Sequence, residues 1–348
     1  VANSETYNML QGQSRMQESA RFALNFLGRG IQMAGYKGCF SQNEEVYSVA
    51  NNPDGIPYEF DVRSGMFAYE GFGGGGGWSP AINEDGLTTL PDTVNDDWFE
   101  SAVVTENSGV PIDQVIPGTD VLTLRRTSST EYQLAEDHSD PTEPVDVETG
   151  DPAFDVGDMV LIHDCEKSTI FRITDLTIDA GAEVTTIGHS IGGTEPFDND
   201  RETLPEVNRF EVDAAVSPIE THIYYIAPGA GINNQDESPL SLWRKSNRGA
   251  PVELVEGVEN FKLLFGEDTN EDGVPNVYST ASGISDYGDV VTVRISITVN
   301  SIDDVGGTSE PTHGCISDGG EQPCIDGELR DGLIRRTFHE TIQVRNRG

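Results

Sequence analysis

The sequence predicts an α+β protein in which one long amino-terminal helix packs on an antiparallel β-sheet head. Two patterns predict this class. Apolar residues recur every three or four positions over residues 1–35, which is the period of an amphipathic helix. Short β-type runs then alternate with turns through the rest of the chain, as in a sheet built from hairpins. With 348 residues, 36% of them hydrophobic, the chain can bury a sizeable core.

The predicted helix occupies residues 1–35. Its apolar stripe consists of Met16, Ala20, Ala23, Leu27, Ile31 and Ala34, and it is widened by Leu10 and Phe26. We expect Gly28, Gly30 and Gly35 to weaken and end the helix. Because the helical pattern starts directly at Val1, which is not Met, we expect it to be the second half of a longer helix. The alternative is a helix that packs only on its own domain.

The β-rich head is predicted over residues 36–348. The runs expected to form strands are 120–124, 159–162, 169–173, 183–187, 222–226, 261–265, 290–299 and 333–344. Long polar segments separate these runs, and we expect them to be loop insertions on the framework. They cover about 50–115, 126–155, 190–218 and 300–330.

The charge excludes several classes of partner. Lys plus Arg is 21 and Asp plus Glu is 60, so the formal net charge is −39. Nucleic acids and anionic lipids are bound through basic surfaces, so we expect neither DNA nor RNA as a partner. The acid excess is diffuse, which favours a marine or halophilic source because concentrated salt screens self-repulsion. A melting temperature that stays constant in rising NaCl would contradict this hypothesis, and the alternative is an ordinary acidic extracytoplasmic protein.

The four cysteines predict disulfide bonds in an oxidising compartment. Four cysteines allow three pairings. Cys315 and Cys324 bracket a short loop that a bridge would close, which leaves Cys39 with Cys165. Neither a CxxC pair nor a Cys/His cluster is present, so we do not expect zinc.

Two motifs are candidate functional sites. Residues 188–192 match G-x-S-x-G, but the following Gly-Thr-Glu-Pro sequence does not predict the helix that would make Ser190 a nucleophile. We expect a turn there and no enzyme. Residues 268–273 match D-x-[DN]-x-[DN]-G, in which side-chain oxygens converge on calcium. The expected calcium ligands are Asp268, Asn270, Asp272, the carbonyl of Val274 and Asn276. Ser279 replaces the bidentate glutamate, and an acidic hairpin turn is the alternative.

Several blocks of the chain resemble PilW-type minor pilins of type IV pili. The first runs from Ser14 through Leu27 to Cys39, and a second is the GTDVL sequence at 118–122. The other similar blocks are 155–165 with 170–174, 254–258, 265–268, 335–341 and 344–347. The loops 50–115 and 300–330 have no counterpart in the resemblance.

The resemblance implies a pilin-like fold and a structural, non-catalytic role. Such a protein is anchored in the inner membrane by an apolar half-helix, with its head in the periplasm, and then joins a cell-surface pilus used in adhesion and twitching motility. The implied partners are other minor pilins, the major pilin and a large adhesin at the pilus tip. The helix residues then expected to pack between subunits are Tyr7, Met9, Leu10, Met16, Ala20, Ala23 and Leu27. The resemblance also implies that the membrane-spanning half-helix precedes Val1.

Two other readings of the sequence stay open. A minor pseudopilin of type II secretion shares the helix-first layout, although its head is usually smaller. A secreted, calcium-dependent adhesive or glycan-binding β-protein is supported by the three tryptophans, Trp78, Trp98 and Trp243. Neighbouring genes for secretion instead of pili would favour the first alternative over a minor pilin. Binding on a glycan array would favour the second.

Overall fold

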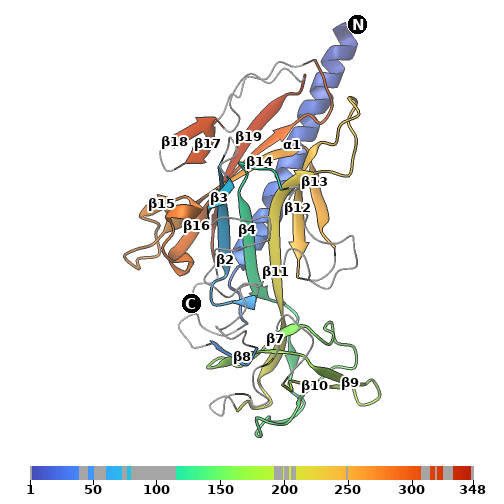
Figure 1. Cartoon of the computed structure of the whole chain (residues 1–348), viewed down its shortest axis with the longest axis vertical. Coiled ribbons are helices and arrows are strands. Elements are labelled where there is room, and N and C mark those ends of the chain that lie inside the picture. Colours follow the sequence, from blue (N-terminus) through green and yellow to red (C-terminus); the bar gives the residue numbers. More distant parts are fainter. Residues whose placement is uncertain are drawn as a thin grey trace.

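The computed structural model describes twelve segments of the chain: residues 2–38, 46–50, 60–72, 77–79, 115–191, 199, 204, 209–247, 250–306, 314–317, 320–323 and 332–345. The molecule is elongated (Figure 1). One helix, α1 (Ala2–Met33), leads from the amino terminus into a body of packed β-strands, and a smaller group of strands lies at the opposite end.

The helix α1 continues through two of the glycines that were expected to end it. A Cβ at Gly28 would lie 3.1 Å from Cδ1 of Ile342, and one at Gly30 would lie 2.8 Å from Cδ1 of Leu124. The missing side chains therefore let α1 approach the strands closely. The expected role is correct only for Gly35, which follows the helix with φ 73°, in the left-handed conformation that commonly terminates helices.

The largest sheet is centred on β11 (Ala215–Pro228), the longest strand among the described residues. The first residues of β11 pair with β7 (Met159–His163) and β5 (Tyr132–Gln133). Its later residues pair with β4 (Val121–Thr127) and β12 (Leu240–Ser246). One strand therefore belongs both to the body and to the smaller group at the far end, which we call the distal lobe.

Five further strands complete this ten-stranded sheet: β1 (Val46–Ser48), β2 (Met66–Phe72), β3 (Gly77–Ser79), β8 (Ser168–Arg172) and β13 (Val252–Glu256). The prediction of a purely antiparallel sheet is wrong for one pair of strands, because β1 and β8 are parallel. The distal lobe contains β1, β5, β7, β8 and a three-stranded sheet of β6 (Val145–Val147), β10 (Val184–Gly188) and β9 (Asp175–Asp179).

The second sheet of the body has four strands in the order β15-β14-β16-β19. They span Val277–Ser279 (β15), Val258–Glu267 (β14), Val290–Asn300 (β16) and Arg335–Gln343 (β19). A two-stranded sheet of β17 (Gly314–Ser317) and β18 (Gly320–Pro323) and two 3₁₀ helices (Ala281–Gly283 and Tyr287–Asp289) complete the described elements.

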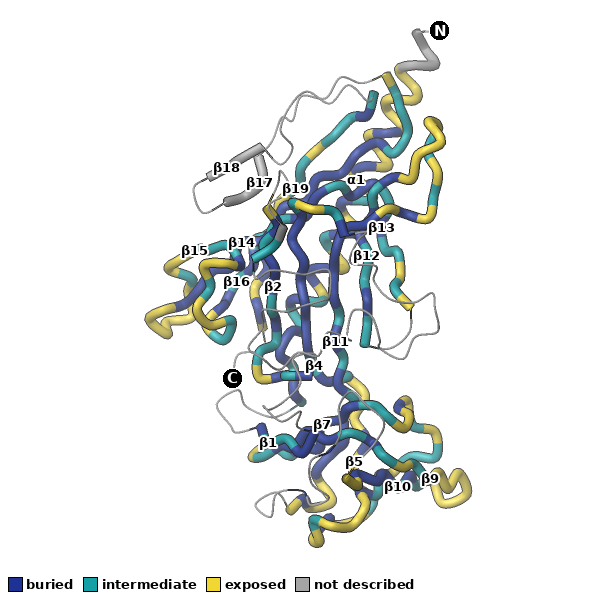
Figure 2. Tube along the Cα trace, viewed as in Figure 1, coloured by how far each residue is buried: buried dark blue, intermediate teal, exposed yellow. Residues whose placement is uncertain are grey.

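The main core lies between α1 and the two sheets of the body. The predicted stripe of α1 is buried there together with side chains of β2, β4, β11, β14, β16 and β19. Buried residues continue along the central strands, and exposed ones gather at the loops (Figure 2). The helix stripe is therefore confirmed, with one correction. Phe26, which was expected to widen it, is 40% exposed, because it lies on the flank of α1, about 100° around the helix axis from Leu27.

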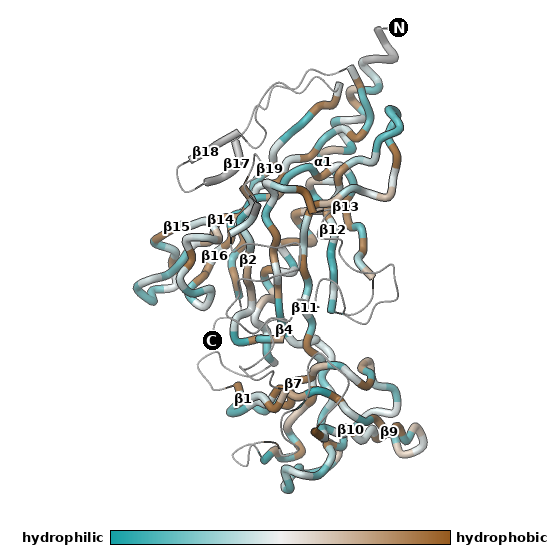
Figure 3. The backbone as a smooth tube through the Cα atoms, viewed as in Figure 1, coloured by the Kyte–Doolittle hydropathy of each residue, from teal (hydrophilic) through white to brown (hydrophobic). Residues whose placement is uncertain are grey.

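All eight runs predicted as strands overlap strands, with ends that differ by at most two residues within the predicted ranges, but the predicted loops contain more structure than expected. The segment 50–115 contains β2 and β3, 126–155 contains β5 and β6, and 300–330 contains β17 and β18. Hydrophobic and hydrophilic residues are interspersed along the strands (Figure 3). None of the helices within the described segments has the length and apolar character needed to cross a membrane.

Candidate functional site

The first turns of α1 form an exposed surface that projects beyond the sheets (Figures 1 and 2). Residues 6–11 are all exposed. Three of them are large and apolar: Tyr7 is 66% exposed, Leu10 61% and Met9 38%. Side chains of this kind are costly in water unless another surface covers them. We call these three residues the projecting patch.

Four of the seven residues expected to pack between subunits cannot do so. Met16, Ala20, Ala23 and Leu27 are at most 3% exposed. They form part of the core between α1 and its own sheets, so no neighbouring subunit can reach them. Of the predicted subunit-packing residues, Tyr7, Met9 and Leu10 remain available.

A second apolar pair on α1 was not predicted as a contact surface. Phe22 and Phe26 are one helical turn apart and are 46% and 40% exposed. The guanidinium of Arg21 lies 5.7 Å from the centroid of the Phe22 ring. The signal was present in the sequence, because an i, i+4 aromatic pair outside the main stripe defines its own helix face. It was missed because Phe26 was assigned to the buried face.

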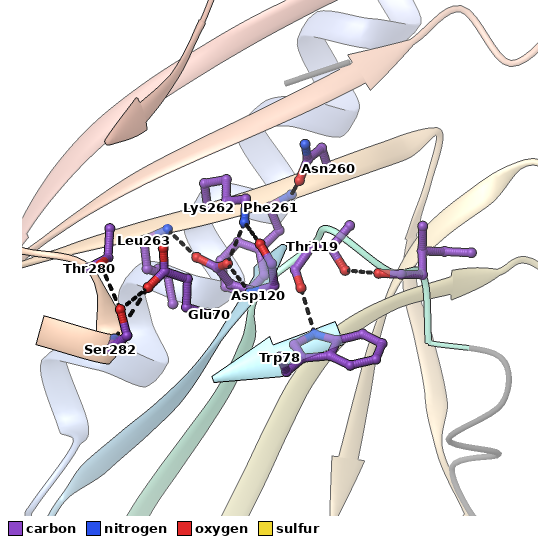
Figure 4. A network of polar contacts seen from close by, with 12 residues as sticks. Glu70, Trp78, Thr119, Asp120, Asn260, Phe261, Lys262, Leu263, Thr280 and Ser282 are labelled. Carbon is purple, nitrogen blue, oxygen red and sulfur yellow. Dashed lines mark hydrogen bonds and ion pairs between the residues drawn. The ribbon is translucent and has the colours of Figure 1, made fainter. Parts of the chain in front are cut away.

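A buried ion pair joins the two sheets of the body (Figure 4). Asp120 belongs to the GTDVL sequence and immediately precedes β4, and Lys262 lies on β14. The Lys262 Nζ lies 2.8 Å from Oδ1 of Asp120 and also donates to the carbonyl of Gly71 on β2. The two Asp120 oxygens accept hydrogen bonds from the backbone N–H groups of Gly71 and Leu263, at 3.0 and 2.8 Å. One carboxylate therefore holds β2, β4 and β14 together.

The surroundings of Asp120 explain why this site is structural. Its side chain is 3% exposed and that of Lys262 is 17% exposed. Burial raises the pKa of Asp120, while the ammonium of Lys262 and the two N–H groups oppose that rise. Nearby, the Trp78 indole donates to the carbonyl of Thr119 at 2.9 Å, and the Ser282 hydroxyl donates to Glu70. These contacts hold β3 against the residues that precede β4, and the 3₁₀ helix Ala281–Gly283 against β2.

The cysteines are only partly covered by the described residues. Cys165 is disulfide-bonded and lies in the turn between β7 and β8. Cys39 and Cys324 lie outside the described residues, and only the backbone of Cys315 is described, within β17. Gly38 lies against His163, since a Cβ there would be 2.5 Å from its Cε1. The chain thus leads from α1 towards the β7–β8 hairpin, and the pairing of Cys39 with Cys165 stays a prediction.

The candidate calcium loop folds around Asp268. Its two carboxylate oxygens accept hydrogen bonds from the N–H groups of Asp272 and Gly273, at 3.1 and 2.7 Å. Although burial raises the pKa of Asp268, such backbone N–H donors lower it overall. Asn276 bonds to Thr269 through both its amide oxygen and its amide nitrogen. Gly273 has φ 83°, which explains the glycine of the motif.

These contacts fold the loop around Asp268, and the calcium site stays a prediction. Within the described ranges, no three His, Cys, Asp or Glu residues are grouped to hold a metal. The predicted site has only two carboxylates and depends on amide and carbonyl oxygens for the rest.

A thermal melt in calcium against EDTA tests this loop. If it binds calcium, we expect the melting temperature to rise with calcium concentration. The bound ion would add about 2.7 kcal/mol to the free energy of unfolding at a calcium concentration of 100 times the Kd. The substitution Asp268→Asn should remove that dependence, whereas Asp140→Asn, at another exposed turn, should not. Equal melting temperatures in calcium and in EDTA would contradict the calcium site and favour the alternative, an acidic hairpin turn.

The remaining sequence motifs form no assembled chemical site within the part of the chain that the structure describes. Ser190 is exposed and follows β10, and its N–H donates to the Thr174 hydroxyl at 2.9 Å. Trp78 and Trp243 are partly buried against the core, so they are not open platforms for a sugar ring. Trp98 and residues 73–76 of the glycine run lie outside the described residues.

Comparison with known protein families finds a match in the second half of the chain. Residues 223–346 match the family Type IV Pilus-assembly protein W. This segment of the chain is PilW-like. The matched segment begins within β11 and contains β12 to β19, so it includes Lys262 and most strands that pack on α1. The PilW resemblance seen in the sequence is thereby confirmed.

One solved structure aligns with this chain, the type IV-like pilin TTHA1219 from Thermus thermophilus. Its sequence identity is 13%, and the alignment covers 55% of this chain and 85% of that one, with a TM-score of 0.24. No curated protein matches the chain.

Proposed function

We propose that this chain is a minor pilin that joins other minor pilins in a priming complex at the tip of a type IV pilus. The observation that carries this proposal is the division of α1 into two parts. Its second part is fixed in the core of the head, while its first turns project with Tyr7, Met9 and Leu10 exposed. A helix of this kind can pack on neighbouring helices while it holds a rigid head on the outside.

The role proposed for the head is structural. The match to a pilus-assembly family supports a non-catalytic function, and the buried Asp120–Lys262 pair and close helix packing support a stable platform. The proposed partners are other minor pilins, the major pilin and a large tip protein. The proposed location is the inner membrane, with a periplasmic head, before assembly and the cell-surface pilus after it. A marine or halophilic source remains part of this proposal.

Complementation of a deletion strain tests the proposal. Deletion of the gene should abolish or strongly reduce surface pili, and the full-length gene should restore them. We expect Leu10→Asp to fail in restoring pili, because a charge in the projecting patch cannot be covered by an apolar partner. Gln13→Asp is the matched control, since Gln13 is an exposed polar residue of the same helix. Sheared pili are measured by immunoblotting and electron microscopy.

The same strains separate the alternative function. Normal pili in the deletion strain, combined with loss of type II secretion, would identify the chain as a minor pseudopilin. If strains with Leu10→Asp and Gln13→Asp made equal amounts of surface pili, the projecting patch would not be needed for pilus assembly.

A further inference from the structure

A groove runs between α1 and the edge strand β19. It has a volume of about 590 Å³. Its floor contains apolar side chains of both elements, among them Leu24, Phe338 and Ile342. Polar side chains form its rim, notably Arg21 and Arg29 from α1 and Glu340 from β19. We call it the α1–β19 groove.

One wall of the groove is an unpaired sheet edge. β19 has nine residues and pairs with β16 on one side, and no described strand pairs with its other side. An edge of this length presents a row of unsatisfied N–H and C=O groups. Extended peptides commonly bind such edges by adding a strand, with specificity supplied by pockets for alternate side chains. The apolar floor beside β19 is such a pocket.

The charge of the groove is opposite to that of the protein. Two arginines face one glutamate in it, whereas the whole chain carries −39. Arg21 and Arg29 are both exposed. Among the described residues, neither takes part in an ion pair with a carboxylate, and the guanidinium of Arg21 lies over the Phe22 ring. Two arginines without carboxylate partners, at the rim of an apolar groove, are complementary to an acidic segment.

The spacing of the arginines matches a strand. Eight residues of helix at ~1.5 Å each separate Arg21 and Arg29 by about 12 Å along α1. Side chains four residues apart on a strand, at ~3.4 Å per residue, are about 13–14 Å apart and lie on the same face. The residue midway between them lies on that face too. It would meet Leu24 and Phe338 on the floor.

We infer that the α1–β19 groove receives an extended segment of a neighbouring subunit, added as a strand to β19. The segment carries an acidic residue, an apolar residue two positions later and a second acidic residue two positions after that. The acidic residues pair with Arg21 and Arg29, and the apolar residue covers the floor. That the partner is a pilus subunit rests on the proposed function, whereas the recognition chemistry does not.

Binding of a defined peptide to the purified 348-residue chain tests this inference. The probe is a fluorescent nine-residue peptide with valine at its centre, glutamate two positions away on each side and threonine elsewhere. The register control has the same composition, with one glutamate moved by a single position so that it points to the opposite face. We expect the probe to bind measurably more tightly than the control, by fluorescence polarisation. We also expect alternate β19 amides to exchange hydrogen more slowly in the complex.

Charge reversal makes the test specific. The double variant Arg21→Glu with Arg29→Glu should lose affinity for the probe by about tenfold or more, and should prefer the same peptide with lysines in place of the glutamates. Glu340→Gln should bind the probe more tightly. Arg209→Glu, which reverses an exposed arginine elsewhere, should change nothing.

Several results would overturn the inference. They are absence of binding at millimolar peptide, equal binding of probe and control, and unchanged preference after charge reversal. Dimerisation of the chain through β19 would assign the groove to a second copy instead. Because these measurements need no pili, they succeed or fail independently of the complementation experiment.

Discussion

Replacement of Asp120 by asparagine is expected to lower the free energy of unfolding by about 3–5 kcal/mol, the cost of removing one member of a buried ion pair. The Lys262 ammonium would then be mostly buried with only neutral oxygen atoms as partners. Because asparagine is nearly isosteric with aspartate, the loss reports the missing charge and not a cavity. Urea denaturation followed by circular dichroism measures it.

Two control variants separate the ion pair from other effects. The double variant Asp120→Leu with Lys262→Met removes both charges, and we expect it to be clearly more stable than Asp120→Asn, because no buried charge remains uncompensated. Asp61→Asn breaks an ion pair whose arginine, Arg63, is 55% exposed, and should cost at most about 1 kcal/mol. An Asp120→Asn variant as stable as the unmodified protein would show that this pair does not join the sheets.

Replacement of Leu27 by alanine is expected to cost about 2.7–5 kcal/mol, the range for a leucine truncated in a packed core. Leu27 is fully buried between α1 and the body sheets, and the backbone around it is held by the close approaches of Gly28 and Gly30. The helix therefore has little freedom to collapse into the cavity. The measurement is again the free energy of unfolding in urea.

The adjacent Phe26 gives a matched control for Leu27. Phe26→Ala removes a larger side chain from the same turn of α1, but the ring is partly exposed, and we expect a loss of stability of less than about 1 kcal/mol. Similar losses for Leu27→Ala and Phe26→Ala would contradict the orientation of α1 described here.

The sequence predicted those elements in which buried apolar residues recur at the regular spacing of a helix or a strand. The stripe of α1 repeats every three or four residues, and β16 alternates over its whole length, so both were identified correctly. β11 was predicted only over its apolar half, because Ser217, Pro218 and Glu220 interrupt the pattern in the other half. β2 was missed inside a glycine-rich segment that resembles a loop.

Long-range relations could not be predicted from local patterns. Asp120 and Lys262 are 142 residues apart in the sequence, and neither differs locally from the many other charged residues. Gly28 and Gly30 were interpreted as helix breakers because helix propensity is a local property, whereas their role is a close contact with β19, β4 and β11. The edge of β19 became apparent only from the pairing of all the strands.

The continuity of β11 has a mechanical consequence. Because the single strand β11 passes from the distal lobe into the body, any swing of the lobe would have to bend that strand. A load applied to the lobe would be carried along that strand, where its hydrogen bonds to β4 and β12 are loaded together in shear. If the chain is assembled in a fibre as proposed, tension on the lobe would reach the sheets that pack on α1 through this strand.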